Sequence, residues 1–408
     1  MLFRSYKEAL ATRQEIGDKE GIGNTLIDTG AFYHDHGKPN EALKFFTDAL
    51  QIERDLGNEY NQALCLNHIG SIRADMGNYQ DALTYLEQAY QLRQKLNVPE
   101  DMAESLHNLA ETNTKLGQYD KALEQYLKAI EIRRSINDQR GIALESDSMA
   151  MIFAAQGRYG AALSAMQDAL KIFKQTKEMT YFTAEITGRW GDLLAQVGRG
   201  DEGRQNIEDA LNIAHQIKND TAASMATNWM GDVNFYKGYF DAARQQYDHA
   251  LQIATKASQR EQILVSKVNK AKADVMQERG SNAIASLKKL AEEADSLGLK
   301  SASVECSVYL GAAMIEAKDY SGAHQQLDLS LARAEKLGLR LLQAKAHYLL
   351  ASLLVKSGKG KEATPHYREV VRILESISKE DGAGRLLERA DLQGAYRDSM
   401  KSFQGANQ

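Results

Sequence analysis

The sequence predicts an all-α fold, a right-handed superhelical solenoid of antiparallel helix pairs. Three observations predict it. Small residues recur every 40 positions over nearly the whole chain, glycine recurs at a fixed place between them, and the 408 residues include only 3 prolines. Proline interrupts helices, so its scarcity favours a long helical array. A fixed period of this length is typical of stacked helical repeats, in which each unit buries its apolar face against its neighbours.

The clearest series lies in the predicted second helix of each repeat. Its first copies stand in the phrases DHGKPNEALKFF, DMGNYQDALTYL, KLGQYDKALEQY and AQGRYGAALSAM. One residue is inserted between the fourth and fifth copies, and every other step is 40 residues. The series is Ala42, Ala82, Ala122, Ala162, Gly203, Ala243, Ala283, Ala323 and Ala363. Nine copies in phase indicate nine repeats.

A second small series lies twelve residues earlier, in the predicted first helix. It consists of Gly30, Gly70, Ala110, Ala150, Gly191, Gly231, Ala271, Gly311 and Ala351. Glycine inside a helix costs about 1 kcal/mol relative to alanine, so its repeated use needs a packing reason. Close approach of two helix backbones supplies that reason, because a larger side chain would hold the helices apart.

Glycine also marks the predicted turn between the two helices of a repeat. The turn glycines are Gly37, Gly77, Gly117, Gly157, Gly198, Gly238 and Gly358. Glycine ends a helix readily because it adopts left-handed backbone angles without strain. The seventh and eighth repeats have Glu278 and Lys318 at this position. Because Gly280 follows shortly after Glu278, we expect the seventh turn to be shifted.

These residues resemble the tetratricopeptide repeat. One unit that fits its pattern contains Leu66, Ile69, Gly70, Gly77, Tyr79, Ala82, Leu86 and Ala89. The family's usual period is 34 residues, so a 40-residue period implies longer helices. The resemblance is to the variant found in kinesin light chains, spindle-orientation scaffolds and bacterial signalling regulators. HEAT and armadillo repeats have a similar length but lack the small-residue series and the Gly-x-Tyr turn.

The repeat divides the chain into three expected segments. Residues 1–19 correspond to the second helix of a repeat whose first helix is missing, because residues 2–17 align with 42–57. Residues 20–379 hold the nine repeats, and residues 380–408 hold a capping helix with a short tail. Within this last segment we expect one amphipathic helix over 384–403. A repeat array needs a polar cap at its end, whereas this one begins on an interior face. We therefore expect the chain to be a fragment of a longer protein.

No motif in the sequence indicates chemistry. Phosphate-binding loops, zinc-protease motifs and nucleophile elbows are absent. His34 and His36 would point to different faces of a helix, which disfavours shared metal binding. We therefore expect no catalytic residue, no cofactor and no metal site.

Composition limits which classes of partner and which cellular compartment can be expected. A net charge of −5 gives no support to nucleic-acid binding, and no apolar run is long enough to span a membrane. Two distant cysteines, Cys65 and Cys306, exclude a disulfide framework. A cytoplasmic protein is expected.

The resemblance implies that the first helices line a concave groove for a partner peptide or protein. Residues three before, or one after, the small position should project there. The candidates are Asn67, His107, Glu111, Asp147, Asp192, Asn228, Asp232 and Tyr348. An asparagine amide can both donate to and accept from a peptide backbone. The carboxylates would favour a basic ligand segment. The alternative is that these polar residues simply form a solvated face.

The sequence thus predicts a protein-interaction scaffold that binds without catalysis. A second interpretation is the C-terminal sensor or regulatory arm of a larger signalling protein. A bacterial kinase, a cyclase or a transcription-regulating ATPase would be examples. The apparently missing first helix motivates this second interpretation.

Overall fold

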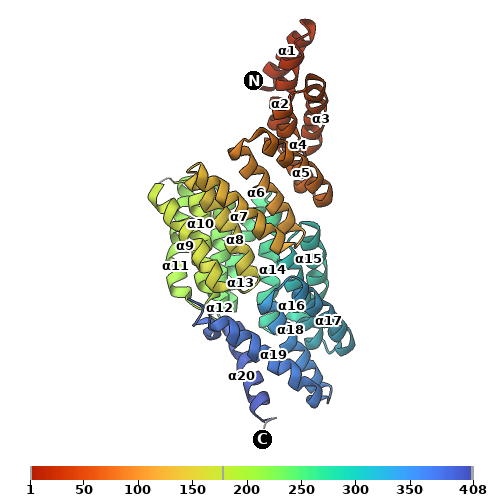
Figure 1. Cartoon of the computed structure of the whole chain (residues 1–408). Helices are drawn as coiled ribbons and strands as arrows, with labels where there is room; N and C mark the ends of the chain where they lie inside the picture. Colours follow the sequence, from red (N-terminus) through yellow and green to blue (C-terminus); the bar gives the residue numbers. More distant parts are fainter. Residues whose placement is uncertain (1, 177–178, 406–408) are drawn as a thin grey trace. The chain divides into compact units, whose positions relative to one another are not determined.

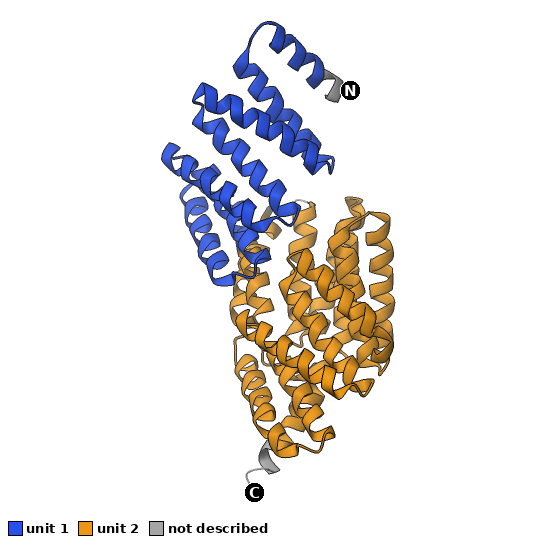
Figure 2. Cartoon of the chain, turned by 90° about the vertical axis from the view of Figure 1, so that its right-hand side faces the viewer, with its two compact units in different colours: residues 1–145 blue, residues 146–408 orange. Residues whose placement is uncertain are grey.

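The structure is a computed structural model that describes residues 2–176 and 179–405 (Figure 1). The described residues form α-helices and two short 3-10 helices, with no strand among them. By contacts the chain divides into two compact units, residues 1–145 (unit 1) and 146–408 (unit 2) (Figure 2). The predicted all-α fold of packed helix pairs is confirmed.

The helices before the unit boundary are α1 (Leu2–Glu15), α2 (Lys19–Asp35), α3 (Pro39–Leu56), α4 (Glu59–Asp75), α5 (Tyr79–Leu96), α6 (Pro99–Lys115) and α7 (Tyr119–Ser135). The boundary lies within α8 (Gln139–Ala155). Unit 2 continues with α9 (Tyr159–Thr176), α10 (Tyr181–Gln196), α11 (Gly200–Gln216), α12 (Asp220–Tyr236), α13 (Phe240–Lys256), α14 (Arg260–Met276), α15 (Ile284–Ser296), α16 (Lys300–Glu316), α17 (Tyr320–Lys336), α18 (Arg340–Lys356), α19 (Gly360–Ser378) and α20 (Ala390–Gly405). The 3-10 helices are η1 (Gly280–Ala283) and η2 (Leu386–Glu388).

Close packing within each helix pair explains the small-residue series. A Cβ atom added to Gly231 of α12 would lie 2.4 Å from Cε1 of Tyr247 in α13. In the pair α10 and α11 the two backbones themselves meet, since a Cβ on Gly191 would lie 2.5 Å from the carbonyl oxygen of Gly203. Glycine is needed at such positions because no real Cβ approaches another atom so closely.

The turns within the pairs adopt the left-handed backbone that the glycines predicted. Gly198 has φ of 84° and Gly238 has φ of 82°. The expected shift of the seventh turn is wrong, since Glu278 itself adopts φ of 58°. What changes is the start of the second helix, where η1 replaces the first helical turn. The carboxylate of Glu316 accepts a 2.8 Å hydrogen bond from the Gly280 amide and so fixes this start.

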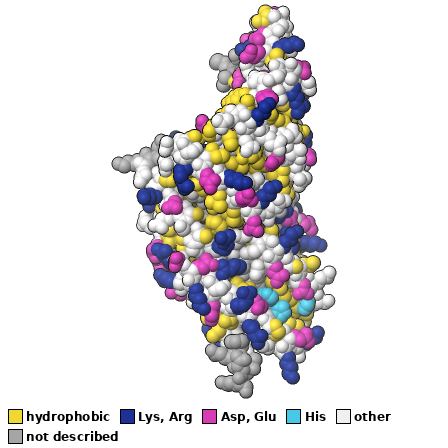
Figure 3. All heavy atoms as spheres, in the orientation of Figure 1, with side chains coloured by type: hydrophobic (Ala, Val, Ile, Leu, Met, Phe, Trp, Pro, Cys, Tyr) yellow, Lys and Arg dark blue, Asp and Glu magenta, His cyan; other side chains and the backbone are white. Residues whose placement is uncertain are grey.

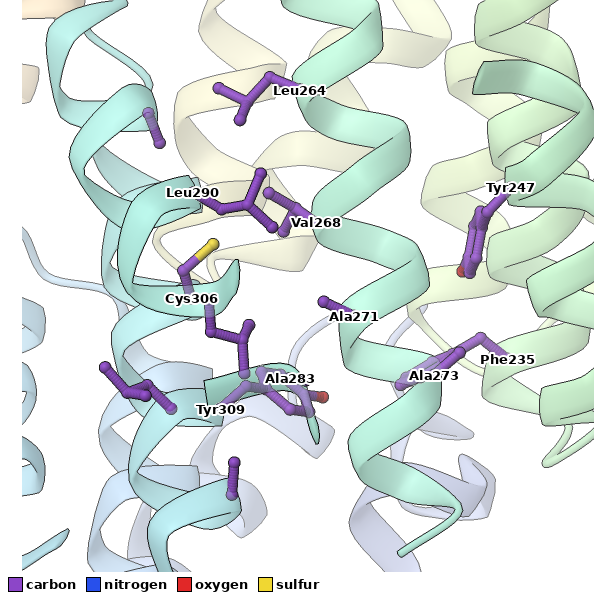
Figure 4. Close-up of a cluster of buried hydrophobic side chains, with 14 of the residues drawn as sticks. Phe235, Tyr247, Leu264, Val268, Ala271, Ala273, Ala283, Leu290, Cys306 and Tyr309 are labelled. Atoms are coloured by element: carbon purple, nitrogen blue, oxygen red, sulfur yellow. The ribbon is translucent and has the colours of Figure 1, made fainter. Parts of the chain in front are cut away.

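A hydrophobic cluster in unit 2 surrounds α14 (Figure 4). Its members include Val268 on α14 and Leu290 on α15, whose side chains point toward one another in Figure 4. Cys306 of α16 completes this layer and is fully buried. The cluster connects successive repeats, as expected of a core that continues from one repeat to the next.

The segment before α20 departs from the expected single helix over 384–403. Helix α20 begins only at Ala390, and Arg389 has extended backbone angles, with φ of −65° and ψ of 130°. Arg389 donates a 2.9 Å hydrogen bond to the carbonyl of Gln196, at the end of α10. Earlier in the segment, the carboxylate of Glu380 accepts a 3.0 Å bond from the amide of Gly160. Residues 380–391 are therefore tied to the fourth and fifth repeats.

Two glycine-to-alanine changes test the packing explanation. Gly191→Ala should lower the thermal midpoint by a destabilisation of about 1–3 kcal/mol, because the added methyl group meets the Gly203 carbonyl. Gly394→Ala in α20 should raise stability by up to about 1 kcal/mol, since no atom lies within 4 Å of its Cβ position. Thermal unfolding followed by circular dichroism measures both. Equal effects of the two substitutions would contradict the explanation.

Candidate partner-binding site

Of the predicted site residues in unit 1, Asn67 joins two first helices. Its side chain is 1% exposed. Its amide nitrogen donates a 3.1 Å bond to Glu104, and its amide oxygen accepts a 3.2 Å bond from Asn108. Both partners lie on α6. Asn67 therefore holds α4 against α6 and presents little surface to a ligand.

His107 and Glu111 lie on α6 and differ in their surroundings. Nδ1 of His107 lies 2.8 Å from Oε2 of Glu145, which is fully buried and also paired with Arg133. Burial lowers the pKa of His107, but the hydrogen bond and charge of Glu145 outweigh it, so the pKa is raised above its ordinary value. Glu111 is exposed. Of these two residues, Glu111 is therefore the one whose side chain is accessible to a ligand.

In unit 2 the predicted Asp147 and Asn228 bond to neighbouring helices. Asp147 is 5% exposed and forms an ion pair with Arg189 of α10. Arg189 is also paired, at 2.6 Å, with Glu185 on its own helix. Asn228 is 2% exposed and donates a 2.9 Å bond to Ser266 of α14. These contacts connect successive first helices.

Asp192 of α10 and Asp232 of α12 are two largely buried carboxyl groups on successive first helices. Asp192 accepts a 2.8 Å bond from Gln196, while its Oδ1 atom is buried without a hydrogen-bond partner. Asp232 accepts a 2.7 Å bond from the hydroxyl of Tyr247. Burial, followed by the charge of Asp232, raises the pKa of Asp192 to about 8. Asp192 therefore keeps its proton near neutral pH.

The remaining candidate, Tyr348 of α18, is half-buried and contacts the C-terminal helix. Its hydroxyl donates a 3.2 Å bond to Asp398 of α20. Tyr348 thus takes part in seating α20 on the preceding repeats.

The C-terminal segment lies close to Asp192 and Asp232, since the charge of Arg389 acts to lower the pKa of both groups. Arg389 is 4% exposed, and its guanidinium lies 3.8 Å from the ring centre of Tyr236, the last residue of α12. It pairs at 2.8 Å with Asp391, which also pairs at 2.8 Å with Lys345 of α18. We call Arg389, Asp391 and Lys345 the C-terminal ionic cluster. The segment lies across the ends of α10 and α12, one helical turn beyond Asp192 and Asp232.

In this cluster one carboxylate, that of Asp391, is shared by two cations. Burial alone raises the pKa of a carboxyl group, but Arg389 and Lys345 hold the pKa of Asp391 below its ordinary value. Asp391 therefore stays ionised and keeps both cations paired. Repeat-based reasoning missed Arg389 and Lys345, because their contacts join residues outside any single repeat.

Unit 1 keeps an exposed face on its first helices. Positions 24, 28, 31 and 35, with their equivalents 40 and 80 residues later, share one face of α2, α4 and α6 because of their helical spacing. The exposed carboxylates on it are Asp28, Asp35, Asp75, Glu104 and Glu111. We call these five residues the acidic face. One predicted candidate, Glu111, belongs to this face. The predicted positions three before the small residue lie one residue earlier than Asp28 on the helix and are less accessible, as at Ile27, which is 8% exposed.

A histidine pairs with one of these carboxylates across two repeats. Nε2 of His34 in α2 lies 3.0 Å from Oδ2 of Asp75 in α4. The hydrogen bond to Asp75 raises the pKa of His34, although partial burial opposes the shift. The contact shows that first helices of successive repeats stand side by side along this face.

Metal clusters and membrane-spanning helices were two further possibilities for the described residues. No group of three or more histidine, cysteine or acidic side chains there could hold a metal ion. None of the described helices has the length and apolar character needed to cross a bilayer. On the surface visible in Figure 3, acidic and basic side chains are interspersed.

Comparison with known proteins identifies the repeat. The tetratricopeptide-repeat profile matches residues 61–135. The profile of anaphase-promoting complex subunit 5 matches residues 2–76, 144–187 and 189–239. Together with the nine helix pairs of the described residues, these matches show that the chain is built from tetratricopeptide-type repeats. Among curated proteins nothing matches the chain significantly.

Two solved structures share the fold. A Rap protein complexed with competence and sporulation factor has a TM-score of 0.63 at 13% identity, covering 88% of this chain and 99% of the Rap chain. The apo form of RapI has a TM-score of 0.52 at 13% identity, covering 74% of this chain and 99% of RapI. At this identity the likeness concerns the fold alone.

The buried carboxyl pair predicts a pH dependence of stability. An unfolded aspartate has a pKa of about 3.9, whereas that of Asp192 is raised to about 8. A raised carboxyl pKa stabilises the folded state fully below the unfolded value, and this stabilisation is lost as pH rises through the folded value. The free energy of unfolding should therefore fall between about pH 5 and pH 8.

Asp192→Asn should remove much of this fall, because the amide does not ionise. Denaturant unfolding at a series of pH values measures the effect. Asp168→Asn, at an exposed position on α9, is the matched control and should leave the pH profile of the wild type unchanged. An Asp192→Asn profile as steep as that of the wild type would contradict the assignment.

Proposed function

We propose that this protein is a scaffold that binds a partner polypeptide on the acidic face of unit 1, through a basic and extended segment of the partner. The observation that carries the proposal is the set of five exposed carboxylates on α2, α4 and α6. In unit 2, by contrast, residues 380–391 lie against the ends of the first helices α10 and α12.

Electrostatics favours a multipoint contact. A single exposed ion pair contributes only about 0–1 kcal/mol, so several contacts along a ligand are needed for useful affinity. Carboxylates spread over three successive first helices can meet several lysine or arginine side chains of one extended segment. Such binding weakens as salt screens the charges.

The likeness to Rap supports binding by a solenoid of this kind. The Rap structure holds competence and sporulation factor on a fold that aligns with 88% of this chain. We extend to the present chain only the general role of a binding scaffold, and we propose that it binds without catalysis. Two free and buried thiols, Cys65 and Cys306, are compatible with the reducing cytoplasm that we propose as its compartment.

A second candidate function is the sensor or regulatory arm of a signalling protein. The same likeness to Rap, complexed with a factor, favours this reading. Under it, the acidic face would bind a domain of the same or an associated signalling protein. A partner with catalytic signalling activity would distinguish this candidate from a passive scaffold.

Charge reversal on the acidic face tests the proposal. Asp28→Lys/Glu111→Lys should weaken binding of the captured partner by about tenfold and reduce the salt dependence of its Kd, because two attractive charges become repulsive. The partner is first captured from lysate of the source organism and identified, and its Kd is then measured at low and physiological salt. Asn67→Ala is unsuitable, since its amide bonds α4 to α6.

The matched control is Asp48→Lys/Glu87→Lys, which makes the same charge change at exposed positions on the second helices α3 and α5. This control should bind as the wild type does. Equal weakening by both double variants would contradict a localised acidic face. Unchanged binding of the Asp28 and Glu111 variant would move the site elsewhere on the chain.

A further inference from the structure

The seventh repeat, in unit 2, contains a cavity. It has a volume of about 560 Å³ and lies between α13, α14, η1 and α15. Binding sites for small molecules commonly measure about 300–1,000 Å³. The cavity is therefore large enough for a compact organic ligand.

The cavity follows from the altered start of the second helix. Helix α15 has 13 residues, whereas the equivalent α13 has 17. The 3-10 turn η1 takes the place of the missing turn, and Glu316 of α16 holds it through the Gly280 amide. As a result α14 packs less extensively against α15 than first helices do against second helices in the neighbouring repeats.

The walls of the cavity carry a surplus of positive charge. Five cations line it, namely Arg244, Lys267, Lys270, Arg279 and Lys289, against two carboxylates, Asp274 and Glu293. Two of these cations, on the wall formed by α13 and α14, are neutralised. Arg244 pairs at 2.8 Å with Asp274, and Lys270 pairs at 2.6 Å with Asp248.

The outer wall is different. Lys267 of α14 and Lys289 of α15 are exposed, and neither forms an ion pair with a described residue. Arg279 has only a 3.9 Å contact with the exposed Asp241. Asn282 and Ser286 add neutral side-chain donors between these cations. Glu293, the other carboxylate of the lining, offsets one of these three cations and leaves a surplus of positive charge beside the neutral donors. Such a surplus suits a multiply charged oxyanion, which accepts charge-assisted hydrogen bonds.

The floor of the cavity is apolar. It is formed by Leu251, Ala271, Ala283 and Leu290. Three of these side chains, all but Leu251, also belong to the buried cluster around α14, and Figure 4 shows them on adjoining elements. An apolar floor below a cationic rim can take a ligand that has both an apolar body and an anionic group.

We propose that this cavity is a binding site for a small organic phosphate. The phosphate group lies at the rim, between Lys267, Lys289 and Arg279, and the apolar part of the ligand lies on Leu251 and Leu290. A phosphate is favoured over a single carboxylate because its second negative charge matches the surplus of cations. The site is independent of the acidic face and of the partner proposed there.

The probe is 1-naphthyl phosphate, which combines an aromatic body with a phosphate group. Isothermal titration calorimetry with the full chain should show saturable binding. Inorganic phosphate and 1-naphthol each carry only half of the proposed interaction and should bind more weakly than the probe. Binding of inorganic phosphate as tight as that of 1-naphthyl phosphate would overturn the assignment of an organic ligand.

Two variants alter the site in different ways. Lys267→Glu/Lys289→Glu reverses the unpaired rim charges and should weaken probe binding by about tenfold or more. Ser286→Tyr keeps the charge but fills the cavity and should also weaken binding. All three positions are exposed, so thermal midpoints close to that of the wild type are expected and are measured in parallel.

Lys288→Glu is the matched control. Lys288 is exposed on the same helix, adjacent to Lys289 in sequence, and does not line the cavity. This variant should bind the probe within about twofold of the wild type, as expected for an exposed charge outside the site. Equal loss in Lys288→Glu and in the double variant would indicate general surface attraction and overturn the proposal. Absence of saturable binding to the wild type would overturn it as well.

Discussion

The position of the C-terminal segment in unit 2 depends on the pairing of three largely buried charges. Arg389 and Asp391 are 4% and 0% exposed in their side chains, and Lys345 of α18 completes the C-terminal ionic cluster. A buried charge that loses its partner costs several kcal/mol, so these residues must stay together once they are out of water. The cluster thereby keeps residues 380–391 against the ends of α10 and α12. That placement brings the charge of Arg389 close to Asp192 and Asp232, one helical turn before the ends of these helices.

The repeats themselves obey a more local constraint. Helix backbones approach one another at paired small residues, as at Gly191 and Gly203, where either Cβ would meet the carbonyl of the other. At this close approach, polar side chains of one first helix bond to the next first helix. Asn67 bonds to α6, Asn228 bonds to α14, and Asp147 pairs with Arg189 of α10. Much of the polar series on the first helices thus connects successive repeats, and the neighbouring exposed residues remain for a partner.

The periodic part of this structure could be predicted from the sequence, because a repeat unit carries its packing pattern in every copy. The small residues, the left-handed turns and the helix pairs were all readable in this way. Two local errors had specific causes, since Glu278 accepts the left-handed backbone without glycine and Arg389 ends a 3-10 turn that the amphipathic pattern did not reveal. The candidate site was less predictable. The buried series that contains Asn67 and the exposed positions such as Asp28 differ by only one residue along the first helix. The bond from Arg389 to Gln196 joins residues 193 positions apart in sequence, which no repeat pattern predicts.

Hydrogen exchange measured by mass spectrometry tests the central claim, that the C-terminal ionic cluster holds residues 380–391 on the ends of α10 and α12. Arg389→Ala is compared with Arg385→Ala, which removes an exposed guanidinium that pairs with the exposed Glu388. The account predicts faster exchange at the ends of α10 and α12 in Arg389→Ala, with no change there in Arg385→Ala and none in α2, α4 or α6 in either variant. Exchange at α10 and α12 as slow in Arg389→Ala as in the wild type would contradict it.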